Sequence, residues 1–84
     1  MTAAEKLSAA GYDDVVIFED YSYDDALVGV TEDGRAVYDY DKMVDWLVQH
    51  TGWDLEDAVE WIEYNTIGAL PSAGPSGPLV MYSL

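Results

Sequence analysis

The sequence predicts an α+β fold: a small, mainly antiparallel sheet of about four strands with helices on one face, in the order α-β-β-β-α-α-β. Two observations support this prediction. Short β-branched and aromatic runs, bounded by turn residues, occupy the first half of the chain. From Asp41 onward the apolar residues recur at helical spacing. The chain has 84 residues, so we expect a single domain spanning residues 1–84.

The first half is predicted to hold one helix and three strands. Thr2 and Glu5 have the spacing of a capping box, and Gly11 is a typical helix terminator, which together predict a helix over about residues 3–10. Strands are expected over residues 15–18, 26–30 and 36–40. The dipeptide Asp33-Gly34 lies between the second and third strands and predicts a tight hairpin with positive φ at its central residues.

The second half is predicted to hold two helices and a last strand. Asp39 or Asp41 is the expected N-cap of the first helix, which Gly52 ends, and Asp54 is the expected N-cap of the next. The buried stripe of that next helix is expected to comprise Leu55, Ala58, Val59, Ile62 and Thr66. Three prolines make residues 71–78 an irregular crossing, and residues 79–84 are predicted to be a terminal strand.

Charge is the most unusual property of the chain. It contains 17 Asp and Glu but only 3 Lys and Arg, for a net charge of −14, although 50% of its residues are hydrophobic. This apolar content predicts a folded protein, whereas disordered acidic tails are poor in apolar residues. A folded surface of one sign repels itself and attracts the opposite sign, so we expect a cationic partner. Nucleic acid and anionic membranes are unfavourable as direct ligands, because both are negatively charged.

The motif content does not favour an enzyme. His50, the only imidazole, lies near the predicted end of a helix, where a positive charge is favourable for the helix dipole. The sequence has no Cys, no Gly-rich phosphate loop and no Gly-x-Ser-x-Gly motif. We therefore expect no catalytic residues and no cofactor.

Calcium is a natural ligand for so acidic a chain, and one stretch partly matches a calcium-binding loop. Asp20, Ser22 and Asp24 have the spacing of the first ligands of an EF-hand loop. Asp25, however, replaces the glycine that the loop requires, and Thr31 replaces its bidentate glutamate. The pattern fails, and we expect no metal site.

The absence of Cys also excludes disulfides and zinc–thiolate sites, as is usual in a reducing compartment. The N-terminal residues lack a basic stretch followed by an apolar one, and no apolar run approaches the roughly 18 residues of a membrane span. We expect a cytoplasmic protein. The sequence leaves its oligomeric state open.

The most informative acidic cluster lies on the last predicted helix. Asp57, Glu60 and Glu63 follow one another at intervals of three residues, with Glu56 beside them. Side chains at this spacing stand about 5–6 Å apart on a helix, a pitch comparable with that of phosphates along a nucleic-acid strand. This helix is therefore predicted to imitate nucleic acid.

Tyrosines interleaved with acids extend the predicted interface. The chain has seven Tyr, more than the core of so small a domain should hold, and Tyr is enriched in protein–protein contacts. Trp46 and Trp61 are expected in the core, and Trp53 is expected to close the helix pair. The candidate partner-binding residues are Asp20, Tyr21, Tyr23, Asp24, Asp25, Asp45, Glu56, Asp57, Glu60, Glu63 and Tyr64.

Three stretches resemble short acidic proteins of bacterial prophages and mobile elements: DGRAVYDYD at residues 33–41, WIEYNT at 61–66 and ALP at 69–71. The resemblance covers residues 12–84. Such proteins include anti-CRISPR and anti-restriction inhibitors that mimic nucleic acid, and no catalytic residues come with them. The resemblance implies a phage-encoded inhibitor in the host cytoplasm, an anti-CRISPR that occupies the basic nucleic-acid channel of a CRISPR effector subunit or another defence nuclease.

Two other interpretations remain open. An acidic surface also serves general solubility or adaptation to high salt, because a run of charges is usually a solvated face. The alternative to an inhibitor is a small structural or regulatory interaction module of a phage, whose charge is mainly solubilising.

Overall fold

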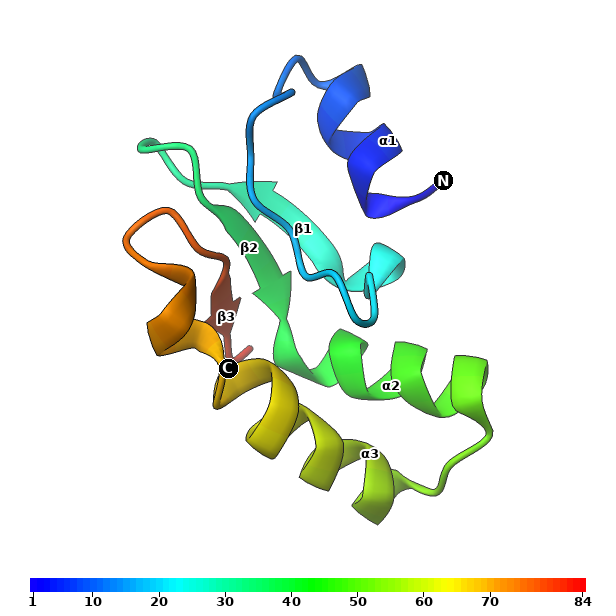
Figure 1. The fold of residues 1–84 in the computed structure, drawn as a ribbon. Coiled ribbons are helices and arrows are strands. Elements are labelled where there is room, and N and C mark those ends of the chain that lie inside the picture. The colour runs from blue at the N-terminus through cyan, green and yellow to red at the C-terminus, as the bar shows by residue number, and fades with distance from the viewer.

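The computed structural model describes residues 1–84 as a small α+β fold with a three-stranded mixed sheet (Figure 1). Its helices and strands are α1 (Ala3–Ala9), β1 (Leu27–Val30), β2 (Ala36–Asp39), α2 (Tyr40–Thr51), α3 (Leu55–Trp61) and β3 (Leu79–Met81). A π-helical segment, Ile62–Ile67, continues α3, and 3-10 turns span Asp24–Ala26 and Leu70–Ala73. No helix is both long enough and apolar enough to cross a membrane.

The sheet has the order β1-β2-β3 and is mixed rather than mainly antiparallel. β1 pairs antiparallel with β2, with an irregularity between Leu27 and Gly29, whereas β3 pairs parallel with β2. The parallel pairing follows from the connection, since the chain crosses through α2 and α3 before it returns to β2. The last strand covers only residues 79–81 of the predicted 79–84.

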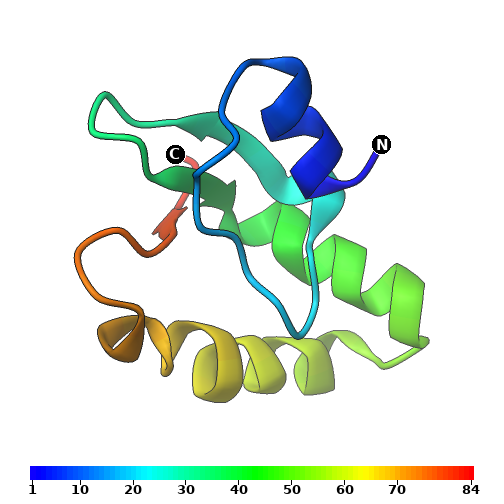
Figure 2. The ribbon, with the colours of Figure 1, turned by 45° about the horizontal axis from the view of Figure 1, so that its top comes forward.

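The strand predicted over residues 15–18 is wrong, so the sheet has three strands and not four. Residues 13–22 make no backbone–backbone hydrogen bond and cross from the α1 end of the molecule towards α3 (Figures 1 and 2). Val15, Ile17 and Phe18 nevertheless pack against the core. Their β-type pattern thus indicates a half-buried surface rather than pairing with a neighbouring strand.

The hairpin between β1 and β2 is confirmed, but its loop is longer than predicted. The Thr31 N–H donates to the Arg35 carbonyl at 2.8 Å, which closes a loop of residues 32–34. Only Gly34 has a positive φ, 84°, and Asp33 does not. This geometry is typical of a three-residue loop with glycine at its left-handed position.

Helix boundaries agree well with the prediction. Thr2 and Glu5 form both hydrogen bonds of the capping box. Asp39, and not Asp41, caps α2 by accepting from the Lys42 N–H at 3.1 Å. Gly52 ends α2 in the left-handed conformation, and the Asp54 side chain caps α3.

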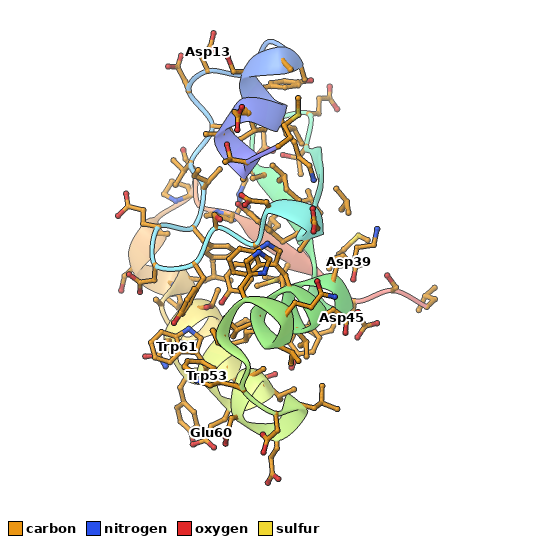
Figure 3. All side chains as sticks on the ribbon, turned by 90° about the vertical axis from the view of Figure 1, so that its right-hand side faces the viewer. Asp13, Asp39, Asp45, Trp53, Glu60 and Trp61 are labelled. Carbon is orange, nitrogen blue, oxygen red and sulfur yellow. The ribbon has the colours of Figure 1, made fainter.

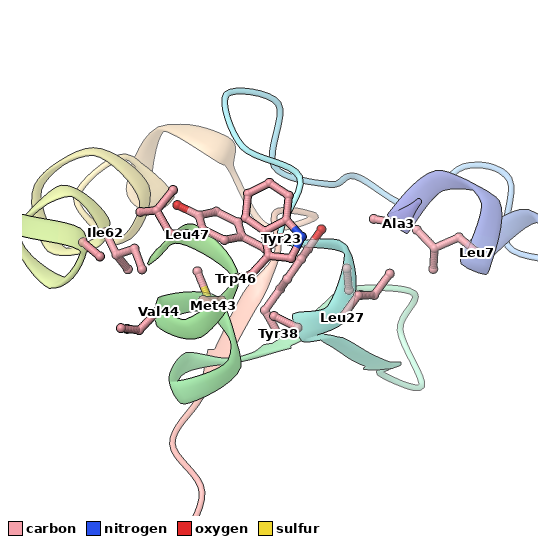
Figure 4. Close-up of a cluster of buried hydrophobic side chains, with 13 residues drawn as sticks. Ala3, Leu7, Tyr23, Leu27, Tyr38, Met43, Val44, Trp46, Leu47 and Ile62 are labelled. Atoms are coloured by element: carbon pink, nitrogen blue, oxygen red, sulfur yellow. The ribbon is translucent and has the colours of Figure 1, made fainter. Parts of the chain in front are cut away.

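The core consists of 13 buried hydrophobic residues that link α1, the sheet and the α2–α3 pair (Figure 4). Tyr23, Tyr38, Met43, Leu47 and Ile62 are its largest fully buried side chains. The large apolar content expected from composition is therefore concentrated around α2.

One member of the predicted α3 stripe is wrong. Leu55 is 63% exposed, whereas Ala58, Ile62 and Thr66 are buried. Trp53, in the turn before α3, packs instead against Trp61, with ring centroids 5.6 Å apart. The apolar contact before α3 is therefore made by the Trp53 indole and not by Leu55.

Candidate acidic interface

Two of the three basic side chains, Lys6 and Arg35, form hydrogen bonds within the chain. The Lys6 ammonium donates to the carbonyls of Asp24 and Leu27 at 2.6 and 3.2 Å. The Arg35 Nε–H donates to the Gly77 carbonyl at 2.9 Å. Lys42 is the last Lys or Arg in the sequence, so every carboxylate of α3 lies in a stretch without basic residues.

The acidic side chains predicted on α3 are all exposed. Glu56, Asp57, Glu60 and Glu63 lie at the surface, and Tyr64 beside them is 77% exposed. Their charge is therefore presented to solvent. Glu56, Asp57 and Glu60 form no hydrogen bond through their side chains within the chain.

Glu63, the last acid of the predicted face, lies in the π-helical segment and not in α3. A π turn contains more residues than an α turn, so it changes which side chains share a face. Glu63 accepts a hydrogen bond from the Tyr40 hydroxyl at 3.0 Å, and the ring centroids of Tyr40 and Tyr82 lie 5.0 Å apart with the rings tilted by 33°. Burial, together with the bond to Glu63, raises the pKa of Tyr40 to about 12. Glu63 thus has a hydrogen-bond partner within the chain, whereas no side-chain hydrogen bond is formed by Asp57 or Glu60.

Asp57 and Glu60 instead border a hollow of about 390 Å³ between α3 and the preceding turn. We call it the aromatic–acidic hollow. Its lining residues are Trp53, Asp57, Glu60, Trp61, Tyr64 and Asn65. Figure 3 shows Trp53 and Trp61 side by side, with Glu60 at the same end of the molecule.

A second hollow, of about 320 Å³, lies beside α2. We call it the Lys42 hollow. It is lined by Asp25, Lys42, Asp45, Trp46 and Gln49. Asp25 and Asp45, both predicted to bind a partner, are exposed here and share the site with a cation of their own chain.

The remaining predicted residues, in the segment before β1, have mixed roles. Asp20 is exposed. The Asp24 carboxylate accepts from the Ala3 N–H at 2.7 Å and so anchors α1. Tyr21 is half-buried, with its ring 5.6 Å from that of Trp61 and 6.2 Å from that of Trp53.

Tyr23 was predicted to bind a partner, and this prediction is wrong. Its side chain is 1% exposed, and its hydroxyl shares a hydrogen bond of 2.7 Å with the Thr66 hydroxyl. Desolvation raises its pKa. The positive φ of 47° at Tyr23 turns the chain so that the ring enters the core.

Sequence reasoning assigned Trp53 and Trp61 to packing and omitted Asn65. A signal was nevertheless present, because Asp57, Glu60, Trp61 and Tyr64 follow the i, i+3, i+4, i+7 spacing of one helix face. Trp61 and Tyr64 share this helix face with two acids. Such a mixed face is as typical of a surface binding site as of a buried stripe.

The structure contains no group of three His, Asp or Glu side chains placed to hold a metal ion. A partly apolar groove of about 380 Å³ runs between residues 16–21 and the segment after α3. Comparisons with protein families, with curated proteins and with solved structures found no match.

Proposed function

We propose that the protein inhibits a bacterial defence system by mimicking nucleic acid, as a phage-encoded anti-CRISPR would. In this proposal the exposed acidic side of α3 occupies a Lys- and Arg-lined nucleic-acid channel of an effector subunit or defence nuclease. The protein performs no chemistry and acts in the host cytoplasm.

The observation that supports this proposal is the uncompensated charge of α3. Glu56, Asp57 and Glu60 are exposed on a helix that has no basic residue. Like charges at helical spacing destabilise a helix by about 0.2–0.5 kcal/mol per pair. A surface that disfavours its own fold in this way is explained if an external cationic surface compensates it.

The physical mechanism is electrostatic. Opposite fields accelerate the encounter of an acidic protein with a basic channel. Carboxylates then replace phosphates as partners of the channel's Lys and Arg. Because nucleic acid and inhibitor need the same cations, the two should exclude each other.

An order-of-addition experiment tests this function. Purified CRISPR effector complexes and restriction nucleases are each mixed with labelled target DNA and the protein, and DNA binding is read by gel shift. We expect one effector to lose DNA binding when the protein is added first, and to lose much less when DNA is bound first, since many phosphate contacts must then break together. Equal inhibition in both orders, with DNA still held, would contradict mimicry.

Two charge-reversed variants serve as a matched pair. Asp57→Lys/Glu60→Lys changes α3, and Asp13→Lys/Asp14→Lys makes the same change in net charge at exposed positions. Figure 3 shows Asp13 at the opposite end of the molecule from Glu60. We expect only the α3 variant to lose inhibition. Equal loss in both would mean that net charge alone acts, and no inhibition by the wild type of any effector would favour the solubilising module.

A further inference from the structure

We infer that the aromatic–acidic hollow is a binding site for a cationic side chain, specifically an arginine guanidinium of the partner. The inference rests on the proposed function and specifies the chemical group that docks on α3. It follows from three features of the hollow: its aromatic walls, its unpaired carboxylates, and the contrast with the Lys42 hollow.

The aromatic walls are held in place by packing behind them. The Tyr21 ring meets Trp53 and Trp61 edge to face, each at an interplanar angle of 79°. The Trp61 Nε1 atom is buried although the residue is half-buried, so the exposed part of this indole is carbon. Trp61 therefore presents carbon rather than its N–H at the surface, and aromatic π surface attracts cations.

The carboxylates supply the second attraction. Asp57 and Glu60 are exposed and line the same hollow as these rings. Carboxylates bind guanidinium and ammonium groups through charge-assisted hydrogen bonds. A cation within the hollow would thus contact aromatic and anionic groups together.

The Lys42 hollow provides a comparison within the same chain. There, Asp25, Asp45 and Trp46 line a hollow whose wall also includes Lys42. The aromatic–acidic hollow has the same combination of carboxylates and indole but no cation of its own among its lining residues. The missing component is one that a basic partner would supply.

Arginine fits these walls better than lysine. Its guanidinium is planar, stacks on aromatic faces and reaches carboxylates with a rigid fork of donors, whereas lysine carries a compact, strongly hydrated charge. The indole faces and the neighbouring carboxylates match the first set of properties.

Titration with short peptides tests the site directly. The probes are blocked Gly-Arg-Gly, Gly-Lys-Gly and Gly-citrulline-Gly, citrulline being the neutral analogue of arginine. The protein has three Trp, so the NMR signals of the indole N–H groups report separately on Trp53, Trp61 and Trp46. We expect the arginine peptide to shift the signals of Trp53 and Trp61 at lower concentration than the lysine peptide, with little effect of citrulline. Trp46, which lines the Lys42 hollow, should stay largely unchanged.

Matched variants separate this site from general attraction to a charge of −14. Asp57→Asn/Glu60→Gln keeps the shape of the hollow and removes its charge, whereas Asp25→Asn/Asp45→Asn removes the same charge from the Lys42 hollow. We expect the first to weaken arginine binding about tenfold, equivalent to ~1.4 kcal/mol, and the second to weaken it much less. Trp53→Leu should also weaken binding, with folding checked by the thermal melt of each variant.

Several outcomes would overturn the site. These are equal shifts with citrulline, equal or stronger binding of lysine, equal losses in both charge variants, or full arginine binding by Trp53→Leu. The peptide assay contains no effector, so it is independent of the proposed function. Arginine binding without inhibition of any effector would reject mimicry alone, and inhibition without arginine binding would reject this site alone.

Discussion

The carboxylates at the junction of β2 and α2 differ sharply from those on the outer side of α3. Asp39 is 5% exposed, accepts from the Lys42 N–H at 3.1 Å, and accepts from the Ser83 hydroxyl at 2.5 Å. Both bonds lower the pKa of the Asp39 carboxyl, and the bond from Ser83 has the larger effect. Asp57 and Glu60 are exposed on a helix without basic residues. Acidic residues of one chain thus serve two purposes, and their hydrogen-bond partners, rather than their number, distinguish them.

Removal of the Asp39 carboxylate should have the largest effect on stability. Asp39→Ala removes the α2 cap and the tie between β2 and the C-terminal segment. A lost cap costs about 0.5–2 kcal/mol and a lost hydrogen bond to a charged group about 1.5–3 kcal/mol, so we expect the free energy of unfolding to fall by ~2–3 kcal/mol. Urea denaturation measures this, and Asp41→Ala, exposed in the first turn of α2, is the control.

The same variant tests the direction of the pH dependence. The pKa of Asp39 is lower in the folded protein than its ordinary value of 3.8. The Asp39 carboxylate therefore stabilises the fold at pH values above 3.8, and this contribution is lost as the pH falls through the lowered pKa. The stability difference between wild type and Asp39→Ala should therefore shrink in acid. A difference that persists at low pH would show that packing, not the carboxylate, holds this junction.

Local signals explain which parts of the fold could be predicted. The capping box at Thr2, the Asp54 cap and the Gly52 terminator each involve residues that are a few positions apart, so sequence alone specifies them. The parallel pairing of β3 and the unpaired state of residues 15–18 depend on contacts between distant segments. Apolar pattern records that a segment is buried but not what it pairs with.

The candidate site shows the same division. The exposure of Glu60 and Tyr64 follows from helical spacing, and the sequence predicted it. The burial of Tyr23 could not be predicted, because it depends on a left-handed backbone turn and on Thr66, which is 43 residues away. The π-helical segment also turned Glu63 towards Tyr40, which an α-helical period does not anticipate.

Two buried tyrosines differ in the same way as the carboxylates, because only one of their hydroxyls is well hydrogen-bonded. Removing these hydroxyls should change the free energy of unfolding by less than Asp39→Ala does. The Tyr23 hydroxyl is bonded to Thr66, whereas the buried Tyr38 hydroxyl has no partner of good geometry and approaches only the Phe18 backbone. Burial raises the pKa of Tyr38 to about 12. Tyr23→Phe should cost ~1–2 kcal/mol because it leaves the buried Thr66 hydroxyl unpaired. Tyr38→Phe should be neutral or stabilising by up to ~1 kcal/mol, because it removes a poorly paired buried group. Equal losses in both variants, measured by urea denaturation, would show that Tyr38 has a partner.

The smallest change in stability is expected for a substitution on α3, and it should stabilise the protein, whereas Asp39→Ala destabilises it. Glu60 has acidic neighbours at i−4, i−3 and i+3, namely Glu56, Asp57 and Glu63. A negative charge is favourable for the helix dipole only in the first turn, and Glu60 lies beyond that turn. Glu60→Gln should therefore raise the free energy of unfolding by ~0.2–0.5 kcal/mol at low salt. Asp57→Asn is the matched control, because Asp57 lies in the first turn and its charge is favourable there, so this variant should be neutral or slightly destabilising.

The gain from Glu60→Gln should disappear at high salt, where exposed charges are screened. Thermal melts at low and high ionic strength decide between the alternatives. A destabilised Glu60→Gln would mean that Glu60 has a structural partner, like Asp39, and would remove the main argument that its charge is directed at another molecule. A stabilised variant that binds the arginine peptide more weakly would show a side chain that disfavours its own fold while it favours a partner. That combination is expected of a binding site and not of a solubilising surface.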